Sequence, residues 1–355
     1  MEILEFRSDT FTLPTESMRR AMNSAELGDD QYGEDPTVRR LEARSAEVVG
    51  KEAAVYVPSG MMGNLCGILS QAGRGEEVIF GDMAHIYQNE MGAFAVLGGL
   101  HGRTVPNRDG LPALADIEGA IRPAAGPFPR TALVCLENSH NNCGGAVITA
   151  DQTRAVAELA HRHGAGVHLD GARIFNAAVA LGVEARDLAA PVDTVQFCFS
   201  KGLAAPVGSV LCGTGETVAK ARKIRKLLGG AMRQSGVIAA AALVALEEMR
   251  ERLVEDHVNA RALADGLAGI PGAVIEPDRV QTNIVSFAID PDAMDAGAFQ
   301  AACLERGLRL SRYLGNSPRL RMVTHHGVSS ADVSAALEIM SAVLAATRVP
   351  AAAAD

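Results

Sequence analysis

The strongest constraint in this sequence is an alternation of short apolar runs with longer segments of helical periodicity. The runs have the length and composition of strands buried in a sheet. Strands that alternate with helices predict an α/β fold, a mostly parallel sheet covered by helices on both faces. The runs are AAVYVP (53–58), EVIFG (77–81), ALVCLEN (132–138), AGVHLD (165–170), TVQFCFS (194–200) and GSVLCG (208–213).

One helix between two of these strands has clear end signals. Thr149 and Gln152 fit a capping box, TRAVAELAHRH has helical spacing, and Gly164 supplies the stop. In a wound parallel sheet, ligands bind at the carboxyl ends of the strands, where the loops carry the reactive side chains. Asp170 lies at such a strand end.

The pattern changes after residue 214. A long helical pattern covers about 214–260, and the strand-like runs AVIEP, TNIVSFAI and LRMVTH follow it. These features predict a smaller C-terminal α+β domain, and a chain of 355 residues is long enough for two domains. We place the large domain, with an N-terminal arm, at residues 1–250 and the small domain at 251–350.

Charge and hydropathy exclude several classes of partner. The net charge of −9 argues against a nucleic-acid partner and against an anionic membrane surface, because both require a basic face. No segment approaches the roughly 18 apolar residues of a membrane span, and MEILEFRSDT lacks the regions of a signal peptide. We therefore expect a cytoplasmic protein.

The cysteines are scattered and form no C-x-x-C pair. Several lie in apolar strand-like runs, which is typical of small buried hydrophobic side chains. We therefore expect neither disulfides nor a metal site. The residues are Cys66, Cys135, Cys143, Cys198, Cys212 and Cys303.

A lysine gives Asp170 a chemical purpose. Lys201 directly follows the strand 194–200, and its separation of 31 positions from Asp170 (201 − 170 = 31) corresponds to one helix and one strand. A lysine at this place can form a Schiff base with an aldehyde cofactor. Pyridoxal phosphate needs such a lysine and a carboxylate that keeps its pyridine nitrogen protonated. A strand-end Asp can also be a turn residue, and a lone lysine is usually solvated.

Two further segments fit a cofactor site. VPSGMMGN (57–64) leads from a strand into a helical pattern, so Ser59, Gly60 and the next amides can face an anion at a helix N-terminus. A structural turn explains the same glycines. His85 follows the strand 77–81 and can stack on a cofactor ring, or it can be a structural histidine.

Taken together, the motifs closely resemble the low-specificity L-threonine aldolases. These are pyridoxal phosphate enzymes of the aspartate aminotransferase-like fold, fold type I. The resemblance runs in unbroken order from about residue 6 to about 345. Its motifs are FRSDTFTLPT, GDDQYGEDPTVRRLE, GKEAAVYVPSGMMGN, LENSHNNCGG, HLDGARIFNAA, SKGLAAPVGS, GGAMRQSGV and LRMVTHH.

The resemblance implies a role for each candidate residue. Lys201 is the Schiff-base lysine, Asp170 the partner of the pyridine nitrogen, and His85 the residue stacked on the ring. The phosphate is expected at Ser59, Gly60 and Met61, and Arg173 is shared by the cofactor and substrate sites. The substrate carboxylate and its surroundings are expected at Ser8, Arg173 and Arg321, with Tyr32, Lys226 and Arg233 in a site completed by a neighbouring subunit, so a dimer or tetramer is expected.

Two departures from the family pattern affect the chemistry. Met61 replaces the last hydroxyl residue of the phosphate turn, and AAGPFPRTAL lacks a second histidine that some members place there. The proton acceptor is then His85, a water or a phosphate oxygen. We expect cleavage of L-threonine, L-allo-threonine and related L-3-hydroxy-α-amino acids to glycine and an aldehyde. A phenylserine preference, β-elimination, transamination or a non-catalytic cofactor carrier are the alternatives.

Overall fold

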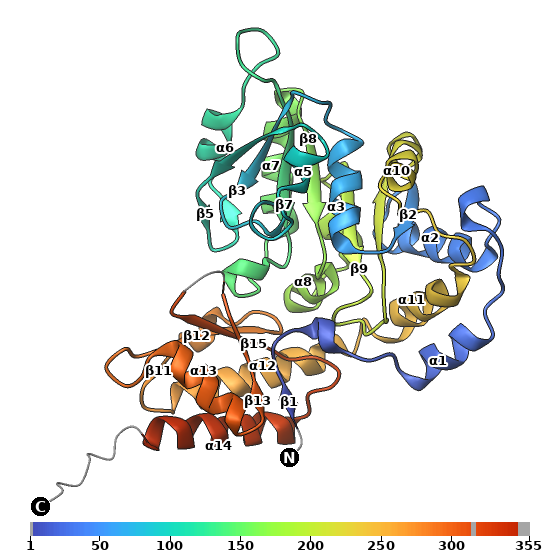
Figure 1. The fold of residues 1–355 in the computed structure, drawn as a ribbon. Coiled ribbons are helices and arrows are strands. Elements are labelled where there is room, and N and C mark those ends of the chain that lie inside the picture. The colour runs from blue at the N-terminus through green and yellow to red at the C-terminus, as the bar shows by residue number, and fades with distance from the viewer. Residues whose placement is uncertain (1–2, 314–316, 347–355) are drawn as a thin grey trace, which may run out of the picture.

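The computed structural model describes residues 3–313 and 317–346. They form two layered units, each around its own sheet and hydrophobic core (Figure 1). The last residues of the predicted small domain, 347–350, lie outside the described residues, and the boundary at residue 250 stays a prediction.

The larger sheet has seven strands in the order β2-β10-β9-β8-β7-β3-β4. All neighbouring pairs are parallel except those that β10 makes with β2 and β9. The six predicted strands and the mostly parallel sheet are therefore confirmed. The strands are β2 (Ala53–Val57), β3 (Glu77–Gly81), β4 (His101–Val105), β7 (Thr131–Glu137), β8 (Gly166–Asp170), β9 (Thr194–Cys198) and β10 (Ser209–Gly213).

Strand β4 is the one member of this sheet that the sequence analysis does not predict. Its sequence HGRTV has no apolar run, and only Val105 is buried. The strand lies at the sheet edge and pairs only with β3. An edge position lets polar residues form a strand, because one side of it stays in water.

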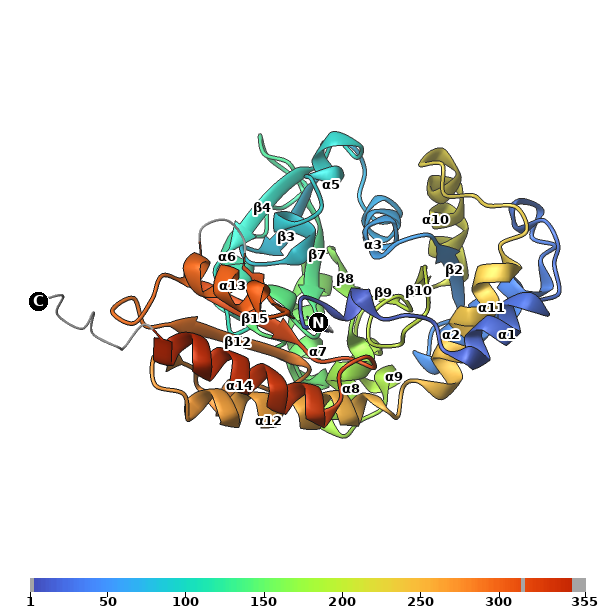
Figure 2. The same cartoon turned by 60° about the horizontal axis from the view of Figure 1, so that its bottom comes forward.

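Helices cover both faces of this sheet (Figure 2), as predicted. On one face, α3 and α10 bury Val55 and Leu211. Other apolar side chains of the sheet, among them Tyr56 and Val210, pack against a second layer of helices on the other face. The helices of this unit are α2 (Pro36–Val48), α3 (Gly60–Leu69), α4 (His85–Gln88), α5 (Ala93–Val96), α6 (Leu114–Ala120), α7 (Ala150–Arg162), α8 (Ile174–Leu181), α9 (Ala185–Ala189), α10 (Gly215–Leu227) and α11 (Gly236–Glu248).

The signals at the ends of α7 act as the sequence predicts. Thr149 accepts a hydrogen bond from the backbone of Gln152, whose side chain returns one to the backbone of Thr149. Gly164 adopts a positive φ of 72° just after the helix. The long pattern at 214–260 is not one helix, however. It divides into α10, α11 and α12 (Leu253–Ala268), with the break after α10 at Gly229 and Gly230.

The smaller sheet is antiparallel and has the order β11-β12-β15-β14. Helices α12, α13 (Ala296–Glu305) and α14 (Ser330–Ala346) surround it, so the predicted α+β unit is confirmed. None of the described helices is long and apolar enough to cross a membrane. The strands are β11 (Ala273–Val274), β12 (Ile284–Ile289), β14 (Ser311–Arg312) and β15 (Arg319–Val323), and a short hairpin elsewhere pairs β5 (Asn107–Arg108) with β6 (Leu111–Pro112).

The N-terminal segment contacts both units (Figure 1). Strand β1 (Leu4–Glu5) pairs in parallel with β13 (Leu308–Arg309), and Phe6 belongs to the core of the smaller unit. The chain then forms the short helix η1 (Asp9–Phe11) and helix α1 (Glu16–Asn23), which packs against α11. This path carries residues 6–12 across the carboxyl ends of the larger sheet.

Candidate active site

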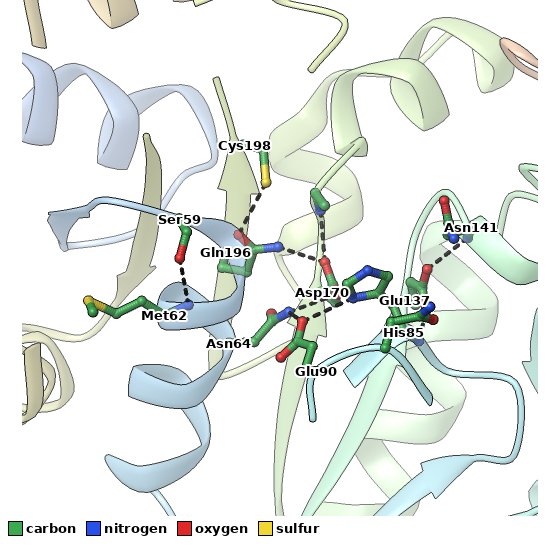
Figure 3. A network of polar contacts seen from close by, with 12 residues as sticks. Ser59, Met62, Asn64, His85, Glu90, Glu137, Asn141, Asp170, Gln196 and Cys198 are labelled. Atoms are coloured by element: carbon green, nitrogen blue, oxygen red, sulfur yellow. Dashed lines mark hydrogen bonds and ion pairs between the residues drawn. The ribbon is translucent and has the colours of Figure 1, made fainter. Parts of the chain in front are cut away.

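Polar side chains gather where three neighbouring parallel strands end. Glu137 of β7, Asp170 of β8 and Gln196 of β9 are partners across the sheet. All three are buried. Buried polar groups need hydrogen-bond partners, and these strand ends therefore hold a connected network (Figure 3).

Asp170 is the centre of this network. Its Oδ1 accepts hydrogen bonds from Gln196 Nε2 at 2.6 Å and from the backbone of Ala172 at 3.0 Å. Its Oδ2 accepts one from Asn64 Nδ2 at 2.9 Å. Burial alone would raise the pKa of Asp170, but the charges of His85 and Lys201 and the hydrogen bonds lower it. The carboxylate therefore stays ionised, and Oδ2 keeps room for one more donor.

Asn64 connects Asp170 to a second buried carboxylate. It lies on α3, and its Nδ2 also donates to Glu90 Oε1 at 2.8 Å. Burial raises the pKa of Glu90 above its usual value, and the charge of Asp170 adds to the increase. His85, Glu90 and Asp170 offer ligand atoms within 4.8 Å of one another, but the amide of Asn64 already donates to both carboxylates.

His85 begins the short helix α4 and points into the network (Figure 3). Its backbone N–H donates to Glu137 Oε2 at 2.7 Å, and its Nδ1 lies 3.0 Å from Glu90 Oε1. Burial lowers the pKa of His85, but the hydrogen bond with Glu90 and the charges of Asp170 and Glu137 raise it overall. Among the described residues, Nε2 has no hydrogen-bond partner.

Lys201 lies in the loop that joins β9 to β10. Because β10 is antiparallel to β9, this loop begins and ends at the same edge of the sheet as Asp170. The backbone carbonyl of Lys201 accepts a hydrogen bond from Thr12 Oγ1 at 3.0 Å. Its ammonium has no hydrogen bond or ion pair among the described residues, although its charge lowers the pKa of both Asp170 and Asp9.

The predicted phosphate turn forms the N-terminus of α3. Ser59 is its N-cap and accepts a hydrogen bond from the backbone of Met62 at 3.2 Å. The first turn of a helix leaves the N–H groups of Gly60 and Met61 without intrahelical acceptors, and these groups attract anions. A Cβ at Gly60 would lie 2.8 Å from Cys198 Sγ, so the turn lies tightly against β9.

Arg173 and Ser8 lie together at the N-terminal segment. Arg173 makes a bidentate ion pair with Asp9, with Nε–Oδ2 and Nη2–Oδ1 distances of 2.7 Å, and its Nη1 donates to Asn141 Oδ1. Ser8 caps η1 and donates to Asp9 Oδ1. The two-pronged edge of Arg173 is therefore already occupied by a carboxylate of this chain.

Arg321 of β15 is in the opposite situation. Its Nε and Nη2 are buried and have no hydrogen-bond partner among the described residues. Burial lowers the pKa of Arg321 to about 10, and the charge of Arg173 adds to this effect, although Asp9 and Glu137 oppose it. Buried donors without partners are costly, so this edge of Arg321 is suited to bind an anion.

The structure does not bring the remaining predicted residues into the network. Tyr32, Lys226 and Arg233 are exposed. They lie on segments that contact one another. Asp30, two residues before Tyr32, forms an ion pair with Arg225, the residue before Lys226, and Asp29 forms one with Arg233. No hydrogen bond or ion pair joins them to Asp170, His85 or Lys201 among the described residues.

A cleft of about 790 Å³ opens beside the network, between the two units. Asn142 and Cys143 line it from the larger unit, and Ser286 and Arg319 from the smaller one. None of the predicted site residues lines the described part of this cleft. The cysteines are free, and all except the half-buried Cys143 are buried, as predicted.

Sequence reasoning missed three residues that organise the site, namely Asp9, Asn64 and Glu90. Asp9 directly follows Ser8 in the FRSDT motif, and Asn64 ends the quoted VPSGMMGN segment. Glu90 follows His85 by five residues, beyond the end of α4. Only Asn64 leaves a signal in the sequence, as a polar residue in an otherwise apolar and glycine-rich segment.

Comparison with known proteins finds matches over most of the chain. The Beta-eliminating lyase family profile matches residues 5–290. The low-specificity L-threonine aldolase 1 of Arabidopsis thaliana is 47% identical over 338 residues, covering 94% of each chain. The Escherichia coli (strain K12) low specificity L-threonine aldolase is 40% identical over 329 residues, covering 92% of this chain and 95% of the relative.

Solved structures show the same fold at low sequence identity. A threonine aldolase of Leishmania major has a TM-score of 0.80 at 19% identity, covering 96% of this chain and 99% of that one. A serine palmitoyltransferase of Sphingomonas wittichii has a TM-score of 0.75 at 21% identity, covering 98% and 87%. Because the sequence similarity spans nearly the whole length of the aldolases, this chain belongs to the low-specificity L-threonine aldolase family.

Proposed function

We propose that this protein is a pyridoxal phosphate-dependent aldolase. It cleaves L-threonine, L-allo-threonine and related L-3-hydroxy-α-amino acids to glycine and an aldehyde. The observation that carries the proposal is the convergence of Asp170, His85 and Lys201 at one end of the sheet, beside the buried, unpaired edge of Arg321. Membership of the aldolase family supports the same reaction.

The described residues fit the cofactor. Asp170 is an ionised, buried carboxylate whose Oδ2 has one hydrogen-bond donor and room for a protonated ring nitrogen. Lys201 offers an amine that has no hydrogen bond or ion pair with residues 3–313 or 317–346, and the first turn of α3 offers amides for the phosphate. When bound, pyridoxal phosphate supplies an electron-withdrawing ring that stores the electron pair of the broken bond.

The side chains of this chain then orient the substrate. Arg321 presents two free donors in parallel, which matches the two oxygens of an α-carboxylate. Arg173, held by Asp9, adds positive charge on the same side, and Ser8 lies beside them. Fixing the carboxylate fixes the rotation about the bond between the substrate nitrogen and the α-carbon. This rotation decides which of the other bonds of the α-carbon can break.

His85 is the proton acceptor for the β-hydroxyl group. Its Nε2 is the only free nitrogen of the ring, because Nδ1 is held by Glu90. The hydroxyl proton moves to Nε2 while the bond between the α- and β-carbons breaks and the aldehyde forms. The sequence offers no histidine in AAGPFPRTAL to take this role.

Tyr32, Lys226 and Arg233 suggest how the assembly completes the site. Lys226 and Arg233 are exposed charged side chains, and the exposed large hydrophobic side chains of Tyr32 and Leu227, the latter at 83%, lie on the same segments. We propose that this surface faces the active site of a neighbouring subunit in a homodimer or homotetramer. The cytoplasm is the proposed location, on the basis of the composition and charge.

Product analysis tests the proposal. The purified protein with added cofactor should release equimolar glycine and aldehyde from a panel of 3-hydroxy amino acids, including phenylserine. Ammonia with a keto acid would identify a β-eliminating lyase instead, and a new amino acid would identify an aminotransferase. Borohydride should fix the cofactor on Lys201, and peptide mapping of the label to another lysine would contradict its assignment.

A further inference from the structure

We propose that Glu90 is a positioning residue that holds the imidazole of His85 in one tautomer. Its buried carboxylate accepts the Nδ1–H of His85, so that Nε2 is the nitrogen presented to the reactants. This inference deepens the proposed function and rests on the role of His85 in it.

The backbone and the carboxylate together fix the imidazole. The carboxylate of Glu90 is 3% exposed and lies 3.0 Å from Nδ1, a normal hydrogen-bond length. The backbone N–H of His85 is held by Glu137 at 2.7 Å, which anchors the start of α4. With both the backbone and Nδ1 held, the ring has little freedom to rotate, and Nε2 remains without a partner among the described residues.

The polar network behind Glu90 sets the direction of this hydrogen bond. Asn64 Nδ2 donates to both Glu90 and Asp170, so Asn64 Oδ1 must face His168, whose Nε2 lies 3.1 Å away. His168 Nε2 therefore carries the proton, and His168 Nδ1 accepts from Thr194 Oγ1 at 2.8 Å. All donors and acceptors in this series of hydrogen bonds have a partner only when Asn64 Nδ2 donates to Glu90.

Glu90 therefore acts as an acceptor on both sides. Its Oε1 receives one hydrogen bond from Asn64 and the other from His85 Nδ1. A histidine that donates from Nδ1 is either the Nε2-acceptor tautomer or the imidazolium. The neutral tautomer can accept a proton on Nε2, and the imidazolium is the form produced when it does.

The charges around the imidazole support this role. The groups that face His85 are the carboxylates of Glu90, Glu137 and Asp170, and those that face Glu90 are Asp170, His85 and the neutral thiol of Cys135. Three carboxylates around one ring stabilise its protonated form. The proton leaves the hydroxyl oxygen, binds Nε2, and the resulting positive charge lies against Glu90.

Two substitutions at Glu90 separate its charge from its hydrogen bond. In Glu90→Gln the side-chain oxygen can still accept from both Asn64 and His85, but the negative charge is gone. We expect the acid limb of the kcat/KM profile to move down by about 1–2 pH units, because the imidazolium loses a stabilising charge. In Glu90→Leu the acceptor is lost, and we expect kcat for threonine cleavage to fall by about 10²-fold or more, with KM little changed.

A double-variant comparison tests whether Glu90 acts through His85. Adding Glu90→Leu to His85→Asn should slow cleavage no further, because the ring that Glu90 holds is absent. The matched control is Glu77→Gln, which removes another buried carboxylate paired with a histidine, His101, at the opposite end of β3. The control should keep the parent pH profile.

A readout independent of turnover is the NMR titration of His85 in the full-length protein, identified as the histidine signal missing in His85→Asn. Glu90→Gln should lower the pKa of this signal, and Glu77→Gln should not. An unchanged His85 titration in Glu90→Gln, or parent activity in Glu90→Leu while His85→Asn is slow, overturns the assignment of Glu90 alone. If His85→Asn itself cleaves threonine at the parent rate, the proposed role of His85 falls, and this inference falls with it.

Discussion

At the scale of single residues, the two buried arginines differ in which edge of the guanidinium is free. Arg173 uses its Nε and Nη2 for Asp9, whereas the same two atoms of Arg321 have no partner among the described residues. The sequence assigns both to the substrate carboxylate, since each follows from a motif. The structure distinguishes them, because only the fold shows that Asp9 meets Arg173.

Arg321→Ala should therefore weaken the binding and cleavage of every amino-acid substrate while the cofactor stays bound. Loss of a desolvated, bidentate contact should cost about 2–5 kcal/mol of transition-state stabilisation, which is measured as a fall in kcat/KM. Steady-state kinetics and the visible spectrum of the bound cofactor measure the two effects. Arg306→Ala is the control, because Arg306 is an exposed arginine of the same unit, at the end of α13 and outside the lining of the cleft. Equal kinetics in both variants would refute the role of Arg321.

His85→Asn should slow threonine cleavage by roughly 10²–10⁴-fold, the usual range for a positioned acid–base group. Exchange of the α-proton of glycine should fall less, because that reaction needs the electron-storing ring but no removal of a hydroxyl proton. Comparing the two rates in the same preparation separates the roles. An equal loss in both reactions would mean that His85 acts on cofactor geometry and not on the proton.

The residues that sequence analysis found and missed differ in a physical way. Asp170 and Lys201 could be predicted from a strong local signal, because each lies at or just after the end of a buried strand. Asn64 and Glu90 matter only because they meet Asp170 and His85 across the sheet. Their importance comes from pairings between distant segments, and one sequence without its fold does not state such pairings.

At the scale of elements, the N-terminal segment connects the site to both units. Asp9 pairs with Arg173 of the larger unit and accepts from Asn283 of the smaller one, while Thr12 donates to the carbonyl of Lys201. The segment was predicted only as an arm of the large domain. Strand β1 is two residues long and pairs with β13, which is too short and too distant a pairing to leave a pattern in the sequence.

Asp9→Asn should destabilise the protein by about 3–5 kcal/mol near neutral pH, because it leaves the buried guanidinium of Arg173 without its counter-charge. The guanidinium lowers the pKa of Asp9 well below its usual value, although burial opposes this. The carboxylate therefore contributes stability above about pH 4, and this contribution decreases as the pH falls below that value.

Urea unfolding of the parent and of Asp9→Asn at several pH values measures this difference. The difference in the free energy of unfolding between the parent and Asp9→Asn should be largest near pH 7 and should decrease below pH 4. Glu247→Gln is the control, since its ion pair with Arg44 is on the surface and should contribute less than about 1 kcal/mol. A gap between parent and Asp9→Asn that is independent of pH would contradict the assignment.

At the scale of the whole molecule, two exposed apolar side chains lie on the surface that we propose as a subunit interface. Leu227 is 83% exposed and Tyr32 is 72% exposed, on segments that contact each other through Arg225 and Asp30. Apolar side chains that group on one surface are typical of an interface between proteins. Symmetric assembly of identical chains is the usual way of covering them.

We expect light scattering to give two or four times the mass of one chain. Leu227→Glu should shift the assembly toward smaller species and reduce activity with it, because Tyr32, Lys226 and Arg233 would no longer reach a neighbouring site. Leu304→Glu, on α13 and 54% exposed, is the matched control and should change neither property. A fully active monomer would refute the proposed assembly.

The fold was more predictable than the assembly or the site. Buried parallel strands are continuous apolar runs, so six strands of the larger sheet stand out in the sequence, whereas the polar edge strand β4 does not. The helices α10, α11 and α12 merge into one pattern, because the breaks between them are short. The hydrophobic pattern of the sequence thus predicts buried strands well but predicts polar edge strands and the breaks between helices poorly.

The pairing of β1 with β13 also constrains the order of events during synthesis. Leu4 and its partner Leu308 are 308 − 4 = 304 residues apart, so Leu4 leaves the ribosome long before its partner is made. Until then, Phe6 has no core to enter, and the segment that carries Asp9 past Arg173 is tethered at one end only. Contacts this far apart in sequence form late. A nascent chain that stops before β13 can build most of the larger sheet, yet it cannot close the site.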